Sequence, residues 1–385
     1  MSVAFVIFGV LVVLCVFSGA NFYVARKLFQ WLRLVFTRMN AKIYICIFVF
    51  FVLSMFLGVS RPFLPIPLVI KNIMAWISAL WMGVFVYLLL LFLVADLVVL
   101  LGSLVRVIPS PVPGAVRFVS GLLAVLLTMS IVSYGLYNAN QIRHVSYDIQ
   151  TGAPELKAGM KIVMISDLHL GAANSEKNLE KVIHDIDEMG PDIVCIAGDI
   201  FNDDFSAIQN PAGVIELFKS IDATYGVYAC LGNHDGGRSL GQMTRLLEES
   251  DIELLNDEYR IIDDRLVLVG RLDASPIGGF GGMKRTDIAD ILSSVDTDLP
   301  IVVMDHNPAR IGEYGNEVGL ILCGHTHRGQ MFPGNLITRA VFTVDYGYYR
   351  KDAESPRVVV TSGAGYWGPP MRVGTNSEIV SINLH

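Results

Sequence analysis

Residues 161–171 have the sequence KIVMISDLHLG. Lys161–Ser166 contains a short apolar run, Ile162–Ile165, which is typical of a β-strand buried in a parallel or mixed sheet. Asp167 and His169 follow this run at once. In open α/β sheets, ligands bind just beyond the carboxyl ends of the strands. This stretch therefore predicts both an α/β fold and a site at one edge of its sheet.

The same arrangement recurs along the second part of the chain. Further strands are predicted at Asp192–Ala197, Val227–Leu231, Leu266–Gly270, Ile301–Met304 and Gly319–Cys323. Helices are predicted at Glu176–Met189, Ala212–Ser220, Gly237–Glu249 and Thr286–Val295. This alternation indicates a largely parallel or mixed sheet covered by helices.

Polar residues that follow five of these strands form one chemically consistent set. Its members are Asp167, His169, Asp199, Asn233, His306, His325 and His327. Carboxylate, amide and imidazole donors without thiolates suit divalent Mn, Fe or Zn. Seven donors exceed one tetrahedral site, whereas two ions sharing a carboxylate fit the number, and such a pair would polarise a phosphoryl oxygen and acidify a water.

Each motif alone also has an ordinary structural interpretation. Asp199 could belong only to a turn, and His306 could cap the helix that follows it. The alternating histidines His325 and His327 are more specific, because such a pattern on an extended segment rarely serves packing. The order of all the motifs, each at a strand end, favours the metal site.

Composition divides the chain into two different parts. The whole chain is 53% hydrophobic and only 17% charged, against about 25% charged in ordinary soluble domains. Residues 1–150 hold ten Lys/Arg and two acids, a charge of +8, which leaves −15 for residues 151–385. These numbers exclude a simple soluble enzyme, and we expect no nucleic-acid partner.

Four apolar stretches in the first part are long enough to be membrane spans, which need about 20 residues. They lie at about 3–25, 43–60, 72–95 and 118–137 within a membrane region 1–137. We expect a linker at 138–157 and a catalytic domain at 158–385.

Basic residues in the loops predict the orientation of these spans. The first and third loops hold seven Lys/Arg and the second holds two, which places both ends of this region outside the cytoplasm. We therefore expect an integral, multi-pass membrane protein with an extracytoplasmic catalytic domain. We interpret Asp96 as the polar end of the third span, although an intramembrane functional carboxylate is the alternative.

The polar motifs resemble, in order, the five motifs of the calcineurin-like metallophosphoesterase superfamily. They are Asp167-Leu168-His169, Gly198-Asp199, Gly232-Asn233-His234-Asp235, His306 and Gly324-His325-Thr326-His327. The segments 165–171, 306–308 and Gly368-Pro369-Pro370-Met371-Arg372 are similar to a membrane-attached phosphodiesterase branch. The resemblance covers residues 160–385 and implies a calcineurin-like α/β sandwich.

The resemblance also implies roles for individual residues. Asp167, His169, Asp199 and His327 would hold one metal ion, and Asp199, Asn233, His306 and His325 the other. His234 would act on the departing oxygen as a hydrogen-bond or proton donor, with Asp235 orienting it.

Two positions depart from the family pattern. Asn202 stands where a second acidic residue is common, although Asp203 follows it, and Arg328 replaces a glycine. Arg328, Arg238 and Arg372 are candidates for binding a substrate phosphate. The alternatives are a role at the rim of the site for Arg328 and surface ion pairs for the other two.

We therefore expect a membrane-anchored, dinuclear metal-dependent phosphoesterase. It would cleave a phosphodiester, pyrophosphate or phosphomonoester of a phosphorylated lipid, lipid-linked or envelope substrate at the bilayer. The alternative is a membrane lipid sensor or transporter whose metal-binding domain is regulatory, and the intact motifs favour the enzyme.

Overall fold

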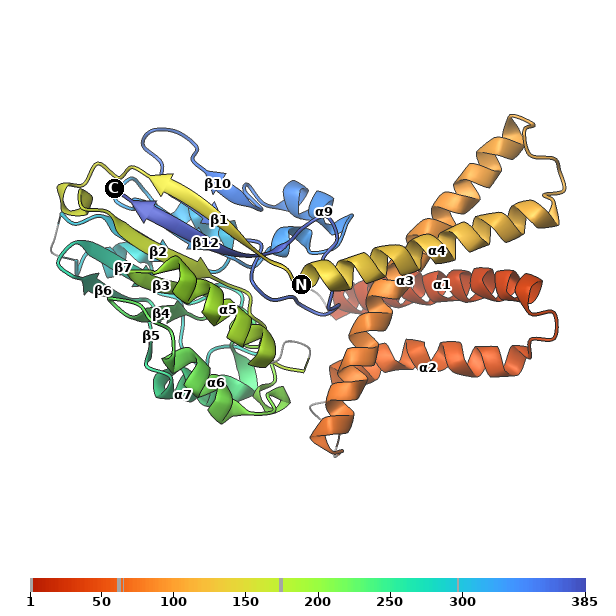
Figure 1. The fold of residues 1–385 in the computed structure, drawn as a ribbon, viewed down its shortest axis with the longest axis horizontal. Helices are drawn as coiled ribbons and strands as arrows, with labels where there is room; N and C mark the ends of the chain where they lie inside the picture. The colour runs from red at the N-terminus through yellow and green to blue at the C-terminus, as the bar shows by residue number, and fades with distance from the viewer. Residues whose placement is uncertain (1–2, 61–63, 65, 173–175, 296–297) are drawn as a thin grey trace. The chain divides into compact units, whose positions relative to one another are not determined.

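A computed structural model describes residues 3–60, 64, 66–172, 176–295 and 298–385. The chain divides into two compact units, Met1–Gly135 and Leu136–His385, and each unit is described by itself (Figure 1).

The first unit is helical. Its helices are α1 (Val3–Val35), α2 (Ala41–Ser60), α3 (Leu68–Leu104) and α4 (Gly114–Ala139), whose last turn enters the second unit. All four are long and apolar enough to cross a membrane, which confirms the four predicted helices. The structure extends them beyond the predicted bounds because the flanking residues include few helix breakers.

Asp96 lies inside helix α3 and not at its end, while the end of the membrane span stays a prediction. Helix α3 continues for eight residues beyond Asp96, because none of these residues is a proline and only one is a glycine. Within the first unit, Asp96 forms an ion pair with Lys27 and accepts a 2.8 Å hydrogen bond from the hydroxyl of Tyr23. A charged pair of this kind keeps a carboxylate compatible with an apolar helix.

The second unit contains two six-stranded sheets. The strands are β1 (Ile142–Ile149), β2 (Met160–Ile165), β3 (Ile193–Ala197), β4 (Val227–Cys230), β5 (Ile252–Leu254), β6 (Glu258–Ile262), β7 (Leu266–Gly270), β8 (Ile301–Met304), β9 (Leu320–Cys323), β10 (Gly347–Tyr349), β11 (Arg357–Val360) and β12 (Ser377–Leu384). The helices are α5 (Glu176–Met189), α6 (Pro211–Lys219), α7 (Leu240–Glu249), α8 (Ile288–Leu292) and α9 (Gly334–Val341). Short 3-10 helices are η2 (Pro154–Leu156), η3 (Phe205–Ala207), η4 (Gly237–Ser239), η5 (Pro308–Glu313) and η6 (His327–Gly329).

Both sheets are mixed. The first has the order β1-β12-β2-β3-β4-β5, and the second has the order β10-β11-β9-β8-β7-β6. Strands β2 to β5 are parallel, as are β11, β9, β8 and β7. The strands that precede the predicted ligands therefore run in one direction within each sheet, which brings their carboxyl ends to a common edge.

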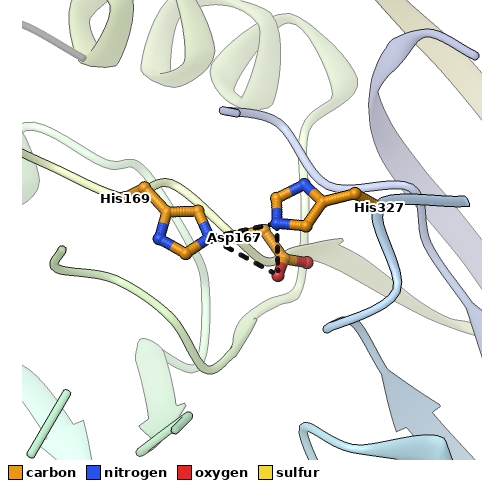
Figure 2. A group of neighbouring side chains, drawn as sticks. All are labelled: Asp167, His169 and His327. Atoms are coloured by element: carbon orange, nitrogen blue, oxygen red, sulfur yellow. Dashed lines mark hydrogen bonds and ion pairs between the residues drawn. The ribbon is translucent and has the colours of Figure 1, made fainter. Parts of the chain in front are cut away.

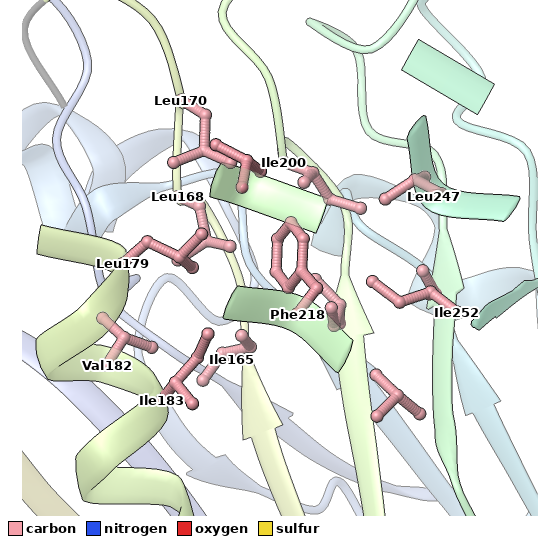
Figure 3. Close-up of a cluster of buried hydrophobic side chains, with 14 of the residues drawn as sticks. Ile165, Leu168, Leu170, Leu179, Val182, Ile183, Ile200, Phe218, Leu247 and Ile252 are labelled. Atoms are coloured by element: carbon pink, nitrogen blue, oxygen red, sulfur yellow. The ribbon is translucent and has the colours of Figure 1, made fainter. Parts of the chain in front are cut away.

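Three layers of apolar side chains hold the sandwich together. Residues of both sheets, such as Met164, Leu268 and Leu322, share one buried cluster between them. Helices α5, α6 and α7 cover the outer face of the first sheet (Figure 1). In α5, Leu179, Val182 and Ile183 recur at helical spacing and face this sheet (Figure 3). Ile186 belongs to the same buried cluster.

The stretch expected as a linker contains a strand. Strand β1 lies within 138–157 and pairs in parallel with β12, Ile142 opposite Ser377. Its residues alternate between more and less buried positions, as expected for an edge strand with one solvated face. The polar sequence of β1 resembles that of a linker, although the strand forms the edge of the first sheet.

Candidate metal centre

Three of the expected ligands form a first group (Figure 2). Asp167 and His169 follow β2, and His327 follows β9. The Nε2 atoms of His169 and His327 lie 3.0 Å apart, and Oδ1 of Asp167 lies 3.4 Å from Nε2 of His327 and 4.0 Å from Nε2 of His169. All three residues are buried.

Asp199, His306 and His325 form a second group from β3, β8 and β9. Nε2 of His306 lies 3.2 Å from Oδ2 of Asp199. Asn233 adjoins this group, because its Oδ1 lies 2.8 Å from Nδ1 of His325. All seven expected ligands thus lie in the two groups or in contact with them.

Asp199 lies between the two groups. The same Oδ2 atom that is 3.2 Å from His306 is 3.6 Å from Nε2 of His169 in the first group. Its other oxygen accepts a 2.9 Å hydrogen bond from the backbone N–H of His234. This carboxylate is therefore fixed in a position from which it can contribute to both groups.

The spacing of the donors fits metal ions. Two ligand atoms at about 2.1 Å from one ion, at a tetrahedral angle, lie about 3.4 Å apart. The spacings of 3.0, 3.4 and 4.0 Å in the first group scatter around this value. Nδ1 of His306 lies 2.8 Å from the carbonyl oxygen of Ala197, an interaction that fixes the ring and directs Nε2 toward Asp199.

The protonation states of three histidines in the site suit metal binding. Burial lowers the pKa of His169 to about 3 and that of His325 to about 4, and it holds the pKa of His327 well below its usual value. These three rings are therefore neutral and have lone pairs to donate. For Asp199, burial opposes ionisation, but the charge and hydrogen bond of His306 outweigh it and lower the pKa of the carboxyl.

The backbone at the ligands is strained. Five of the seven adopt positive φ: Asp167 (55°), His169 (45°), Asp199 (51°), His325 (71°) and His327 (48°). Non-glycine residues rarely adopt this conformation, which costs on the order of 1–3 kcal/mol at each position. Strain repeated at functional side chains indicates that the surrounding fold holds them in position for a ligand.

Two glycines allow the ligand loops to approach each other. A Cβ atom at Gly324 would lie 1.9 Å from Oγ of Ser166 and 2.5 Å from Oδ2 of Asp167. A Cβ atom at Gly232 would lie 2.3 Å from Oδ1 of Asp199. Only glycine fits at these two positions without moving a ligand.

The expected partner of His234 differs from the one in the structure. Asp203, not Asp235, contacts the ring, with its Oδ1 2.9 Å from Nδ1 of His234. Burial lowers the pKa of His234, but the hydrogen bond to Asp203 and the charge of Asp199 outweigh this effect and raise it. The ring of His169 has its centroid 5.2 Å from that of His234, so His234 borders the first group.

Asp235 instead holds two ligand loops together. Its carboxylate accepts hydrogen bonds from the backbone N–H groups of Ile200 (3.2 Å), Phe201 (2.8 Å) and Gly232 (2.8 Å). The first two amides follow Asp199, and the third precedes Asn233. Asp235 thus positions the loops of two ligands, whereas the resemblance implied that it orients His234.

The three candidate arginines lie in different environments. Arg238 is exposed on η4, and Arg328 is half-buried with its guanidinium 4.1 Å from the ring centroid of Tyr346. Arg372 is fully buried, and its Nη2 donates to the carbonyl oxygens of Ser362, Gly363 and Gly365. These contacts turn Nη2 of Arg372 to the backbone, so the residue does not form the surface ion pair given as its alternative role. Its binding of a substrate phosphate stays a prediction.

Trp367 is a neighbour of the site that sequence reasoning missed. Its ring centroid lies 5.9 Å from that of His234, and its side chain is 49% exposed. The side chain of Gln330 accepts from the N–H of Trp367 and donates to its C=O, both at 2.8 Å. The only available signal was its position directly before Gly368.

Comparisons with known proteins agree with this geometry. The family model for calcineurin-like phosphoesterases matches residues 160–329. An uncharacterized metallophosphoesterase of Campylobacter jejuni is 30% identical, over 70% of this chain and 70% of that protein. A Danio rerio transmembrane protein with a metallophosphoesterase domain is 31% identical, over 68% of this chain and 62% of its own length.

A Bacillus subtilis relative, the uncharacterized metallophosphoesterase YkuE, is 29% identical over 59% of this chain and 79% of that protein. The expected site motifs, the paired donor groups and these relatives agree with one another. The chain belongs to the calcineurin-like metallophosphoesterases and is a hydrolase of phosphoric esters.

Proposed function

We propose that this chain is a membrane-anchored phosphoesterase with a dinuclear metal centre that acts on a phosphorylated lipid, lipid-linked or envelope substrate. The observation that carries the proposal is the position of Asp199, one oxygen of which lies within 3.6 Å of histidines from both donor groups. A carboxylate shared in this way is the arrangement that two-metal phosphoryl chemistry requires.

In this proposal Asp167, His169, Asp199 and His327 hold one ion, and Asp199, Asn233, His306 and His325 hold the other. The donor set suits Mn, Fe or Zn. Bound divalent ions would supply Lewis acidity toward a phosphoryl oxygen and lower the pKa of a water. We propose the same site for diesters, pyrophosphates and monoesters, since each presents oxygens to the same donors.

His234 acts as the general acid in this proposal. Asp203 accepts the hydrogen bond from Nδ1, which leaves Nε2 for the departing oxygen of the substrate. The hydrogen bond to Asp203 and the charge of Asp199 outweigh burial and raise the pKa of His234, which favours the protonated ring. Transfer of this proton neutralises the leaving alkoxide as its bond to phosphorus breaks.

The four apolar helices and the name of the Danio rerio relative support the membrane anchor. The excess of basic residues in the first and third loops supports an extracytoplasmic catalytic domain. Cysteine introduced at the exposed Ser206 tests this orientation. An impermeant thiol reagent applied to intact cells should label it, and labelling only after lysis would contradict the orientation.

Hydrolysis of bis(p-nitrophenyl) phosphate by the full chain with manganese tests the enzymatic proposal. Replacing Asp199 by alanine should abolish this activity, whereas replacing the more exposed Asp263 by asparagine should leave it unchanged. Full activity of Asp199→Ala in metal-replete protein would overturn the mechanism. Metal binding by the wild type without turnover of any phosphoester would favour the sensor or transporter instead.

A further inference from the structure

Five large apolar side chains near the metal centre are exposed. They are Phe332, Leu336, Ile337, Val341 and Trp367, and we call them the apolar rim. Helix α9 contributes three of them and has no buried residue of its own. Exposed clusters of this kind on a soluble surface mark sites of contact with a protein or a membrane.

The rim belongs to two segments that are joined beside the ligands. The N–H of Phe332 donates to the C=O of Val373 at 2.8 Å, and the N–H of Val373 donates to the C=O of Gln330 at 3.0 Å. Gln330 in turn holds the backbone of Trp367. Helix α9 contacts η6, which begins at the ligand His327.

The side chains of α9 are arranged for an interface between water and an apolar phase. Leu336 and Ala340, like Ile337 and Val341, are four residues apart and share a face. The hydroxyl of the half-buried Thr338 donates to Oδ2 of Asp345 at 2.8 Å. Residues 331–341 contain one basic residue and no acidic residue, so no negative charge within this segment opposes contact with an anionic membrane surface.

The last turn of α4, which belongs to the second unit, is bonded to the same segment. The side chain of Asn138, in the last turn of α4, donates to the carbonyl oxygens of Arg372 (3.2 Å) and Thr375 (2.8 Å). The hydroxyl of Ser377 donates to the C=O of Ala139 at 2.9 Å. Helix α4 has 26 residues, about 39 Å at 1.5 Å per residue, so a helix crossing a core of about 30 Å ends near the headgroups.

From these contacts we infer that the apolar rim inserts into the bilayer surface where α4 leaves the membrane, and that it positions a lipid phosphoester at the metal centre. Tryptophan is enriched at the membrane–water interface, and in this arrangement Trp367 would contact the interface while its ring adjoins His234. The acyl part of the substrate stays in the bilayer while its phosphate reaches the donor groups. This inference deepens the proposed function and rests on it for the identity of the substrate.

The insertion itself is tested without any turnover. The full chain, with the exposed Cys15 and Cys46 replaced by serine, receives a nitroxide at Ile337→Cys and is placed in phospholipid nanodiscs. Ile261→Cys on β6 is the matched control, since Ile261 is 47% exposed and Ile337 64%. We expect the label at 337 to collide mainly with oxygen, which partitions into lipid, and the label at 261 mainly with a water-soluble chromium chelate.

Equal access of the chelate to both labels would overturn the insertion. The insertion would also be overturned if the label at 337 is protected from the chelate in detergent and loses this protection when the protein is diluted to single copies. The surface would then be an interface between two chains. Neither outcome depends on catalysis, so a failure of the insertion is distinguishable from a failure of the proposed enzyme.

Delivery of the substrate is tested with two esters that share a leaving group. Phosphatidyl-p-nitrophenol in nanodiscs carries acyl chains, and bis(p-nitrophenyl) phosphate is soluble. We expect the double variant Leu336→Ser/Ile337→Ser to lose at least tenfold in kcat/KM for the lipid ester and to keep its rate on the soluble ester, with Ile261→Ser unchanged on both. An equal effect on the two esters would contradict the role of the rim in delivery.

Discussion

Replacing Asp203 by asparagine should shift the alkaline limb of the pH–rate profile to lower pH. The carboxylate contacts Nδ1 of His234 at 2.9 Å and stabilises the protonated ring, so its removal lowers the pKa of His234. A charged hydrogen bond contributes about 1.5–3 kcal/mol, but the Asp203 side chain is 48% exposed. We therefore discount the contribution to about 1 kcal/mol, which corresponds to about 0.7 pH unit.

A general acid must be protonated to act, so the rate falls as pH rises through its pKa. Above that pKa, Asp203→Asn should be about fivefold slower than the wild type, which follows from 0.7 pH unit. The assay is kcat/KM for an alkyl phosphodiester, whose poor leaving group needs the proton. Asp204→Asn is the matched control, because Asp204 bonds to Ser206 instead. An equal shift in both variants, or in neither, would refute the assignment of His234 and its partner.

Three further perturbations probe the site. Gly324→Ala should abolish tight metal binding in calorimetry, because the added carbon would lie 1.9 Å from Oγ of Ser166. The control Gly312→Ala, whose added carbon meets no atom within 4 Å, should bind metal normally. Normal metal binding by both variants would contradict the close packing at Gly324. Arg372→Met should lower the free energy of unfolding by about 3 kcal/mol, since it leaves buried carbonyls unpaired, and a rise in KM with unchanged stability would restore the substrate role. Metal affinity should rise by up to about tenfold for each unit that the pH is raised. The charge of Asp199 overcomes burial and raises the pKa of His306, and the proton on this ring must leave when a metal binds. A metal affinity that does not depend on pH in calorimetry would refute this linkage.

The sequence predicted the strands that carry the ligands because their signal is local. An apolar run followed directly by Asp, Asn or His identifies both the strand and the donor, as at Ile301–Met304 and His306. Helix α5 was likewise predicted with its observed bounds, since its apolar residues recur at helical spacing.

Strands defined by distant partners were missed. Strand β1 lies beside β12, which is more than 220 residues further along the chain, and its polar, half-exposed residues do not differ from those of a linker. Strands β5 and β10 have only three residues each, too few for a periodic pattern. Pairing that forms only in the folded sheet has no local signature.

In the site, likewise, the sequence predicted which residues are the ligands but not which residues surround them. The sequence indicated which residues donate, but the resemblance implied Asp235 as the partner of His234, whereas the structure places Asp203, whose φ is 56°, against the ring. Positive φ values at the histidine ligands also oppose the intrinsic preference of the residue. These features follow from tertiary contacts around the loops and not from local propensity.

Electron paramagnetic resonance of the manganese-loaded protein tests the central claim most directly. If Asp199 joins two metal sites, the purified chain should bind two Mn²⁺ ions and give an exchange-coupled spectrum, because the shared carboxylate links ions about 3.5–4 Å apart. Asp199→Ala should lose the coupling, while the control Asp263→Asn should keep it. A single ion per chain, or two ions with uncoupled six-line spectra in the wild type, would contradict a shared dinuclear centre.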